Sequence, residues 1–314
     1  RRGYAGFVSC RSCGEVMKCP HCDVSLSEHK GGRLICHYCG YTQPMPKLCP
    51  KCGSKYILGF KAGTQQIEEK LKELYPGVRT LRMDADTTRT KDSYEKILSS
   101  FANGEADVLI GTQMIVKGHD FPKVTLVGIL AADLSLNASD YRAGERTFQL
   151  LTQAVGRAGR GVLPGEAVIQ TYQPDHYAIT CATAQDYESF YQEEILYREL
   201  SGYPPVAHML AVQIYGKEEE NVKQLALRLT DVVKSNMDFL SGKQKEQSNK
   251  KIQVLGPAPA NISKINDIYR YVFYVKHAEY DVLVEVKDRL EETLRQWQPR
   301  QMSIQFDFDP VSVL

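Results

Sequence analysis

Apolar residues in the middle of the chain form short β-branched runs that alternate with stretches of helical character. The runs lie at 78–83, 108–110, 124–130 and 168–171, and the helical stretches at 65–75, 91–102 and 140–157. This alternation is typical of a parallel sheet covered by helices, and a continuous apolar run is typical of a central strand. We therefore predict an α/β domain whose catalytic loops follow the carboxyl ends of its strands.

A different order of elements follows the turn-rich segment at 201–205. The pattern predicts strands at 210–215, 252–255, 269–276 and 303–308, and helices at 218–240 and 279–297. The order β-α-β-β-α-β is that of a ferredoxin-like α+β domain. The polar and charged segment 241–251 is expected to be a loop.

The first part of the chain is marked by cysteine. Eight of the nine cysteines form four Cys-x-x-Cys pairs: Cys10/Cys13, Cys19/Cys22, Cys36/Cys39 and Cys49/Cys52. Two such pairs place four thiolates about 2.3 Å from one Zn²⁺, in a structural site with no open position. Four disulfides are the alternative. We predict two zinc ions instead, because the pairs carry the turn residues of zinc knuckles and no signal peptide is recognisable.

The spacing of the pairs predicts how they combine. Thirteen residues between the second and third pairs leave room for a hairpin around 33–35, whereas the first and second pairs are separated by five. We therefore expect nested groups: an inner one of Cys19, Cys22, Cys36 and Cys39, and an outer one of Cys10, Cys13, Cys49 and Cys52. Eight thiolates saturate two ions, so the histidines His21, His29 and His37 are expected at the surface.

Composition bounds the remaining possibilities. With 314 residues, 43% hydrophobic and 25% charged, the chain is long enough for two or three compact domains. No apolar run reaches the roughly 18 residues of a membrane span, so we expect a soluble, intracellular protein without a membrane partner. The net charge of +1 gives no signal for nucleic acid. The ninth cysteine, Cys181, lies in a helical context and is expected in the core.

The helix predicted at 140–157 has two unlike faces. At about 100° per residue, its large apolar residues point one way and Gln153, Arg157 and Arg160 point nearly opposite. Gly156 and the glycines after it keep the backbone bare, which suits the close approach of a phosphate. The guanidinium fork binds phosphate oxygens in pairs and stays charged during phosphoryl transfer. The alternative is a solvated basic helix end capped by glycine.

These residues resemble two motifs of superfamily 2 helicases. Gln-x-x-Gly-Arg-x-Gly-Arg at 153–160 resembles motif VI, and Ile-Gly-Thr-Gln-Met-Ile-Val-Lys-Gly-His-Asp-Phe-Pro at 110–122 resembles motif V. Both belong to the second RecA-like lobe. Directly after an eight-cysteine module, they resemble the bacterial replication-restart primosomal helicases, the PriA family. The resemblance covers essentially the whole chain.

The resemblance implies the C-terminal half of an ATP-dependent 3′-to-5′ DNA helicase that recognises stalled replication forks and assembles the primosome. The implied partners are forked and single-stranded DNA, single-strand DNA-binding protein, and primosome or helicase-loading proteins, in a bacterial cytoplasm and at its nucleoid. The implied domains are the end of a first lobe-2 strand at 1–9, a double zinc module at 10–54, a RecA-like lobe 2 with helices on both sheet faces at 55–200, and the α+β domain at 201–314.

The resemblance also assigns roles to single residues. By it, Arg157 and Arg160 reach the ATP phosphates as arginine fingers, and Gln153 positions the attacking water. Three residues border the nucleotide: Gly118, Asp120 and Gly156. Four residues contact DNA without reading its sequence: Thr64, Thr112, Gln113 and Lys117. The acids Asp84 and Asp86 look like a metal dyad, but by the resemblance they follow a strand of this lobe, and we expect them to anchor the turn.

The sequence has no Gly-x-x-x-x-Gly-Lys-Ser/Thr loop and no Asp-Glu pair at a strand end. The ligands of ATP and Mg²⁺ would then belong to the full-length protein, and we expect this chain alone not to hydrolyse ATP. The alternative function is a non-catalytic, zinc-containing platform that binds DNA and protein. The intact face of Gln153, Arg157 and Arg160 favours the helicase. The aromatic and basic residues at 260–270 suit either base stacking or packing on helices.

Overall fold

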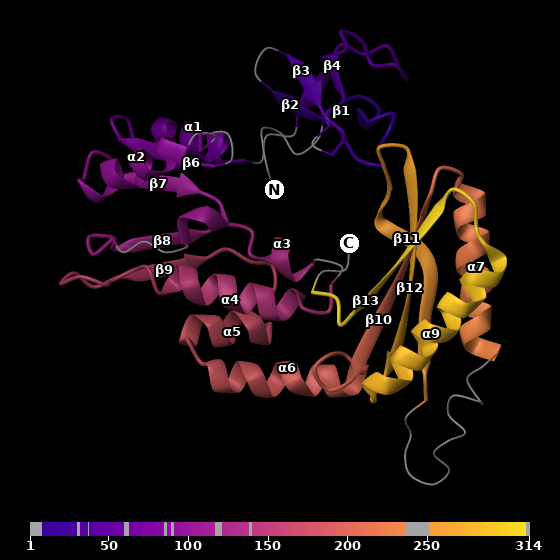
Figure 1. Cartoon of the computed structure of the whole chain (residues 1–314). Coiled ribbons are helices and arrows are strands. Elements are labelled where there is room, and N and C mark those ends of the chain that lie inside the picture. The colour runs from indigo at the N-terminus through magenta and orange to yellow at the C-terminus, as the bar shows by residue number, and fades with distance from the viewer. Residues whose placement is uncertain are drawn as a thin grey trace. The chain divides into compact units, whose positions relative to one another are not determined.

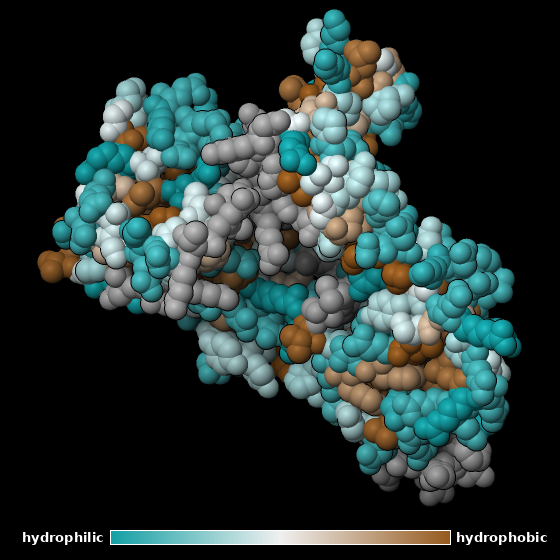
Figure 2. Space-filling model, turned by 45° about the horizontal axis from the view of Figure 1, so that its top comes forward, coloured by the Kyte–Doolittle hydropathy of each residue, from teal (hydrophilic) through white to brown (hydrophobic). Residues whose placement is uncertain are grey.

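The computed structural model describes residues 8–29, 32–36, 38–59, 63–84, 87–88, 91–116, 121–137, 140–235 and 251–311 (Figure 1). By their contacts the residues form two compact units. The first contains Arg1–Pro20, Val24–Leu134 and Arg146–Gln185, and the second His21–Asp23, Ser135–Glu145 and Asp186–Leu314. No helix of the described residues is both long and apolar enough to cross a membrane. The face seen in Figure 2 is mostly hydrophilic, and its apolar residues form separate patches.

The cysteine-rich segment folds into very short strands. Strand β1 (Val8–Cys10) pairs antiparallel with β5 (Ile57–Gly59). Strands β2 (Ser27–His29), β3 (Arg33–Ile35) and β4 (Thr42–Pro44) form a three-stranded antiparallel sheet. The hairpin predicted around 33–35 is therefore confirmed, and a third strand extends it. Few apolar side chains are fully buried in this segment, among them Val8, Leu26 and Leu34.

The strands and helices predicted for the middle of the chain are present. Strand β6 (Thr80–Met83) pairs in parallel with β7 (Val108–Gly111), and β8 (Leu126–Ile129) pairs in parallel with β9 (Glu166–Ile169). The helices of this region are α1 (Thr64–Leu74), α2 (Lys91–Ala102), the 3₁₀ turn η1 (Gln113–Val116), α3 (Asp133–Leu136), α4 (Ala143–Val155) and α5 (Tyr177–Ala184). Parallel pairing is the α/β arrangement that the alternating pattern predicts.

The second unit contains the α+β domain predicted from the last third of the chain. Its elements are α6 (Tyr187–Ser201), β10 (His208–Gly216), α7 (Glu219–Ser235), β11 (Gln253–Ile265), β12 (Ile268–His277), α9 (Tyr280–Trp297) and β13 (Met302–Phe308). The four strands form one antiparallel sheet in the order β11-β12-β10-β13, the order of a ferredoxin-like fold.

Alternation along the central strands builds the core of this domain. Leu210, Val212 and Ile214 of β10 point to one face, where they pack with Phe273 of β12 and with apolar residues of α7 and α9. Figure 1 shows both helices lying along one side of the sheet. The opposite face is thus left for other segments of the second unit to cover.

Candidate functional site

Eight cysteine sulfurs lie in two compact groups. One contains Cys10, Cys13, Cys49 and Cys52, the other Cys19, Cys22, Cys36 and Cys39, and within each group all four sulfurs lie within 4.8 Å of one another. These are the nested outer and inner groups that the spacing predicts. His21 belongs to neither group, while His37 and the side chain of His29 lie outside the described residues.

The sulfur separations fit a tetrahedral ion. The Sγ atoms of Cys10 and Cys52 lie 3.6 Å apart, those of Cys13 and Cys49 3.7 Å, and those of Cys19 and Cys39 3.6 Å. Four sulfurs at about 2.3 Å from Zn²⁺ would stand about 3.8 Å from one another. A disulfide needs a sulfur separation of about 2.05 Å, so these pairs are thiols. The donor sets therefore suit two structural zinc ions.

Three of the four Cys-x-x-Cys turns share one backbone pattern. The glycine directly after the second cysteine, Gly14, Gly40 or Gly53, donates its N–H to the carbonyl of the first cysteine at 2.9–3.0 Å. Each of these glycines has φ between 71° and 77°, a conformation that other residues rarely adopt. The glycine thus closes the turn so that both sulfurs point to the same place.

Backbone donors also favour the thiolate form. Burial acts to raise the pKa of Cys10, but hydrogen bonds from the backbone N–H groups of Cys13 and Ser12, together with the side chains of Cys52 and Cys13, lower it to about 6. The backbone N–H of Ser54 also acts to lower the pKa of Cys52, but the sulfurs of Cys13, Cys10 and Cys49, together with burial, raise it to about 12. The neighbouring sulfurs thus oppose a second negative charge, and the donor set suits a cation that binds thiolates.

The segment that holds the two arginines differs from the prediction. Helix α4 ends at Val155, so the predicted continuation of the helix to residue 157 is wrong. The N–H of Arg157 donates to the carbonyl of Ala154, three residues back, and not to the residue four back as in an α-helix. The N–H of Gly159 donates to the carbonyl of Val124, which lies outside the helix. Gln153 alone of the three polar residues lies on the helix.

Glycines set the path of the loop after α4. A Cβ on Gly165 would lie 2.1 Å from the nitrogen of Gly159, and a Cβ on Gly161 would lie 2.1 Å from the carbonyl oxygen of Pro122. Gly159 itself has a φ of 72°. Only glycine allows these backbone crossings, so the loop that presents the arginines is fixed by contacts that leave no room for a side chain.

The arginines lie on this loop, past the helix. Arg160 is exposed, and its Nε donates to the carbonyl of Gly156 at 2.6 Å. Arg157 is half-buried and Gln153 is exposed. The first unit thus carries Gln153, Gly156, Arg157 and Arg160 on one helix end and the loop that follows it. Three further predicted contacts of this lobe, Gly118, Asp120 and Lys117, lie outside the described residues.

The predicted DNA contact Thr64 is the first residue of α1 and is part of a polar network. Its hydroxyl donates to Oδ2 of Asp84 at 2.6 Å, and the Nε of Arg82 lies 2.9 Å from the same oxygen. The other oxygen of Asp84 accepts the N–H of Thr87 at 3.0 Å. Asp84 thus anchors the turn, as predicted, while Asp86 lies outside the described residues.

Neither Arg82 nor the link from Thr64 to Asp84 was predicted from the sequence. A signal existed for Arg82, because it stands two residues before Asp84 and so on the same face of the strand. No local signal joins residue 64 to residue 84. Since the Thr64 hydroxyl is engaged by Asp84, a phosphate at this point would meet the first N–H groups of α1, which have no partner within the helix.

Thr112 and Gln113 follow β7 and are both exposed. The residue before them is Gly111, where a Cβ would lie 2.6 Å from the carbonyl oxygen of Met83 and 2.5 Å from a methyl carbon of Ile115. Glycine therefore lets the ends of β6 and β7 approach closely. This places Thr112 and the loop after Met83 at the same edge of the parallel pair.

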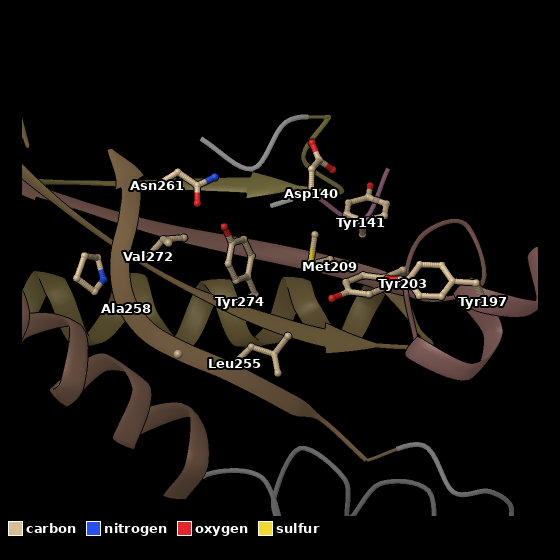
Figure 3. Close-up of a pocket in the computed structure, with 12 residues that line it drawn as sticks. Asp140, Tyr141, Tyr197, Tyr203, Met209, Leu255, Ala258, Asn261, Val272 and Tyr274 are labelled. Carbon is tan, nitrogen blue, oxygen red and sulfur yellow. The ribbon is translucent and has the colours of Figure 1, made fainter. Parts of the chain in front are cut away.

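The second unit has a cavity of about 540 Å³ on the sheet face away from α7 and α9 (Figure 3). Tyr203 and Tyr141 stack with ring centroids 4.9 Å apart, and the Nζ of Lys276 lies 3.9 Å from the Tyr203 centroid. A ring and an ammonium this close cannot share one face, so both faces of Tyr203 are covered. Burial, Asp140 and Tyr203 raise the pKa of Tyr274 to about 12. The tyrosines of this cavity were not singled out from the sequence.

Three protein-family models match the chain in succession. The PriA DNA helicase Cys-rich region (CRR) domain matches residues 19–44, the helicase conserved C-terminal domain matches 48–162, and the primosomal protein N C-terminal domain matches 199–311.

Proteins named replication restart protein PriA match over most or all of the chain. The protein of Bacillus subtilis (strain 168) is 43% identical over 316 residues, which cover 100% of this chain and 38% of that protein. The protein of Synechocystis sp. is 40% identical over 318 residues, which cover 100% of this chain and 36% of that protein. That of Chlamydia muridarum is 42% identical over 279 residues, which cover 88% of this chain and 36% of that protein. The chain thus spans well under half of the length of these relatives.

Proposed function

The chain belongs to the family of the replication restart protein PriA, and from that premise we propose that it is the C-terminal portion of an ATP-dependent DNA helicase. In the proposed activity the complete protein moves 3′ to 5′ along DNA, recognises stalled forks and restarts replication by assembling the primosome. One observation carries the proposal: a PriA Cys-rich region, a helicase C-terminal domain and a primosomal C-terminal domain follow one another along a single chain.

The loop after α4 is the part of this chain that we assign to ATP. Arg157 and Arg160 carry fixed positive charge beside backbone that glycine keeps bare, which suits them to negative charge developing on a transferred phosphoryl group. In this proposal Gln153 orients the attacking water, while Gly156, Gly118 and Asp120 border the nucleotide. Arg160 would release the Gly156 carbonyl to reach a phosphate. The residues that bind ATP and Mg²⁺ directly would come from a lobe that this sequence does not contain.

The carboxyl ends of β6 and β7 are the part of this lobe that we assign to DNA. Thr112 and Gln113 follow β7, and the hydroxyl of Thr64 bonds to Asp84 directly after β6. In this proposal these three residues and Lys117 contact phosphates, which position the strand without reading bases. Forked and single-stranded DNA are the proposed nucleic-acid partners. Single-strand DNA-binding protein and helicase-loading proteins are the proposed protein partners, and the nucleoid is the proposed location.

The two cysteine groups are proposed to hold two zinc ions. In each group four sulfurs close the coordination shell, so the ion would supply folding energy and no chemistry. We propose domain boundaries at 10–54 for this module, 55–200 for the helicase lobe and 201–314 for the α+β domain. The module is a rigid scaffold suited to contact the fork and the primosome proteins.

A non-catalytic platform that binds DNA and protein is the competing function. The glycine crossings at Gly159 and Gly165 favour the helicase, because a loop without a catalytic duty has no need of so exact a path for its arginines. The platform would be favoured instead if the arginines proved dispensable for turnover.

Binding of the purified chain to a three-way fork, a blunt duplex and a single strand across a salt series tests the DNA proposal. Phosphate contacts weaken steeply with salt, whereas recognition of fork shape persists. We expect a preference for the fork that survives rising salt, and no ATP hydrolysis by the chain alone. Equal, salt-sensitive binding to all three substrates would remove fork recognition from this chain, and ATP turnover by the chain alone would refute the assigned division of the ATPase site.

Replacing Arg157 by alanine in a protein that also carries the ATP-binding lobe tests the arginine finger. We expect turnover to fall by roughly 10³-fold or more, as for other arginine fingers, with DNA binding unchanged. Arg289→Ala, an exposed arginine of α9 paired with Glu292, is the control and should leave turnover intact. Retained turnover in Arg157→Ala would exclude the finger and support the platform.

A further inference from the structure

One of the four cysteine turns is built differently from the other three. After the second cysteine of each pair the sequence has Gly14, Gly40 and Gly53, but after Cys22 it has Asp23. In the other turns the glycine N–H bonds to the carbonyl of the first cysteine of its own turn. The N–H of Asp23 instead bonds to the carbonyl of Lys264 at 2.9 Å. This turn is therefore completed from outside.

The segment that completes it is the turn between β11 and β12. Residues 21–23 lie in the second unit with that hairpin. Ser263 Oγ donates to the carboxylate of Asp23 at 2.9 Å, and the N–H of Asp267 donates to the carbonyl of His21 at 2.9 Å. The Nδ1 of His21 lies 2.7 Å from the carboxylate of Asp267. Each residue from 21 to 23 thus has a hydrogen bond to the hairpin, since Cys22 receives one as well.

The bond to Cys22 reaches the sulfur itself. The backbone N–H of Asn266 donates to the Sγ of Cys22 at 3.2 Å. Asn266 and Asp267 both have positive φ, 50° and 59°, and the residues on either side of them, Ile265 and Ile268, pair across the strands. This is a two-residue turn of the primed type, whose central N–H groups point away from the hairpin's own ladder. Both of these N–H groups donate to the cysteine turn, that of Asn266 to the sulfur of Cys22 and that of Asp267 to the carbonyl of His21.

We propose that the β11–β12 turn orients the sulfur of Cys22 for the inner zinc ion, with Asn266 and Asp267 as the positioning residues. The proposal rests on the assignment of zinc to Cys19, Cys22, Cys36 and Cys39. An N–H that bonds to a zinc-bound thiolate disperses part of its negative charge and fixes the direction of the sulfur. The ion pair of His21 and Asp267 adds little by itself, because its side chains are 44% and 60% exposed. Its role is to hold the turn in place.

The direct test is an NMR experiment on the isotopically labelled chain loaded with ¹¹³Cd²⁺. In this experiment magnetisation passes from the metal through the sulfur to a hydrogen-bonded amide proton. We expect the Asn266 amide to correlate with the ¹¹³Cd signal that also correlates with the β protons of Cys22. The amides of Ser12 and Cys13, which bond to the sulfur of Cys10, are the positive control. A spectrum with the control correlations and without that of Asn266 would overturn the proposal. Fewer than two cadmium ions per chain would instead overturn the zinc assignment.

Two glycine variants of the same turn test the consequence for zinc. Asp267→Gly keeps the turn's positive φ but removes the carboxylate from His21, so one of the two zinc ions should pass to a competing chelator several-fold faster. The expected effect is smaller than the roughly 10- to 100-fold change typical of a partner bonded directly to a ligand. Asn266→Gly keeps the N–H and the φ, and should release zinc at the unaltered rate. Asp267→Asn, which still accepts from His21, should lie between them. Equal rates in all four proteins would refute a positioning role.

Discussion

The cysteine-rich module and the C-terminal α+β domain reach a fixed structure by different means. The module has strands of three residues and few buried apolar side chains, whereas the α+β domain buries a continuous cluster of 15 residues between its sheet and two helices. Short strands with so little apolar area do not hold together alone. The module must therefore draw its stability from the ions that join its turns, and the α+β domain from apolar area removed from water.

The largest effect should come from breaking one cysteine group. Cys36→Ser should reduce the metal content from two zinc ions to one and unfold the inner part of the module. In small zinc fingers the apparent free energy of zinc binding, about 10–16 kcal/mol, is what drives folding. Amide hydrogen exchange should rise across β2, β3 and β4 and stay unchanged across β10 and β12. Cys181→Ser, which alters a cysteine outside both groups, should keep both ions. Two ions in Cys36→Ser would exclude this ligand assignment.

The α+β domain should respond to the opposite change. Phe273 is fully buried between the sheet and its helices, and Phe273→Ala should cost about 3–5 kcal/mol of unfolding free energy. Urea unfolding followed through the exchange of β10 and β12 amides measures this, and the zinc content should remain at two. Tyr172→Ala, at a side chain that is 96% exposed, is the matched control. If Phe273→Ala released zinc and spared the β10 amides, the two sources of stability would not be separate.

The same contrast explains what the sequence predicted. The strand predicted at 210–215 is β10, and the spacing of the cysteine pairs predicted the nested groups. Both signals are local or depend only on a regular repeat.

The end of helix α4 and the support of Cys22 could not be predicted in the same way. Helix α4 stops at Val155 because the N–H of Gly159 finds a carbonyl at Val124 and the loop crosses Gly165. The missing glycine after Cys22 was visible in the sequence, but its replacement partner at Lys264 is 241 residues away. A local pattern shows that a turn is incomplete and carries no information about the distant segment that completes it.

In a third region, the loop at 156–165 that carries Arg157 and Arg160, the structure is held neither by a metal nor by a large core but by close backbone contacts. Gly165→Ala would place a methyl group 2.1 Å from the nitrogen of Gly159, and the required shift should cost about 1–3 kcal/mol, as overpacking typically does. Gly128→Ala is the matched control, because a Cβ there has open space and should be neutral or slightly stabilising. Thermal unfolding of the two variants measures the difference. Equal midpoints would mean that the crossing at Gly159 relaxes without cost.

The smallest effect should come from an ion pair on the surface of the helicase lobe, where neither metal nor apolar area is involved. Hydrogen bonds from the Arg79 side chain and backbone lower the pKa of Asp107 to about 2. Because the folded pKa lies below the ordinary value of about 3.9, the pair stabilises the fold above that value and loses its contribution as the pH falls toward 2. Asp107→Asn should thus lower the unfolding midpoint slightly at pH 7, and by progressively less as the pH falls through about 2. Both side chains are about half exposed, so solvent screens the pair and keeps the effect small. An equal loss at both pH values would show that Asp107 acts through packing and not through its charge. The source of stability at this site would then be close contact, as in the loop after α4, and not an ion pair.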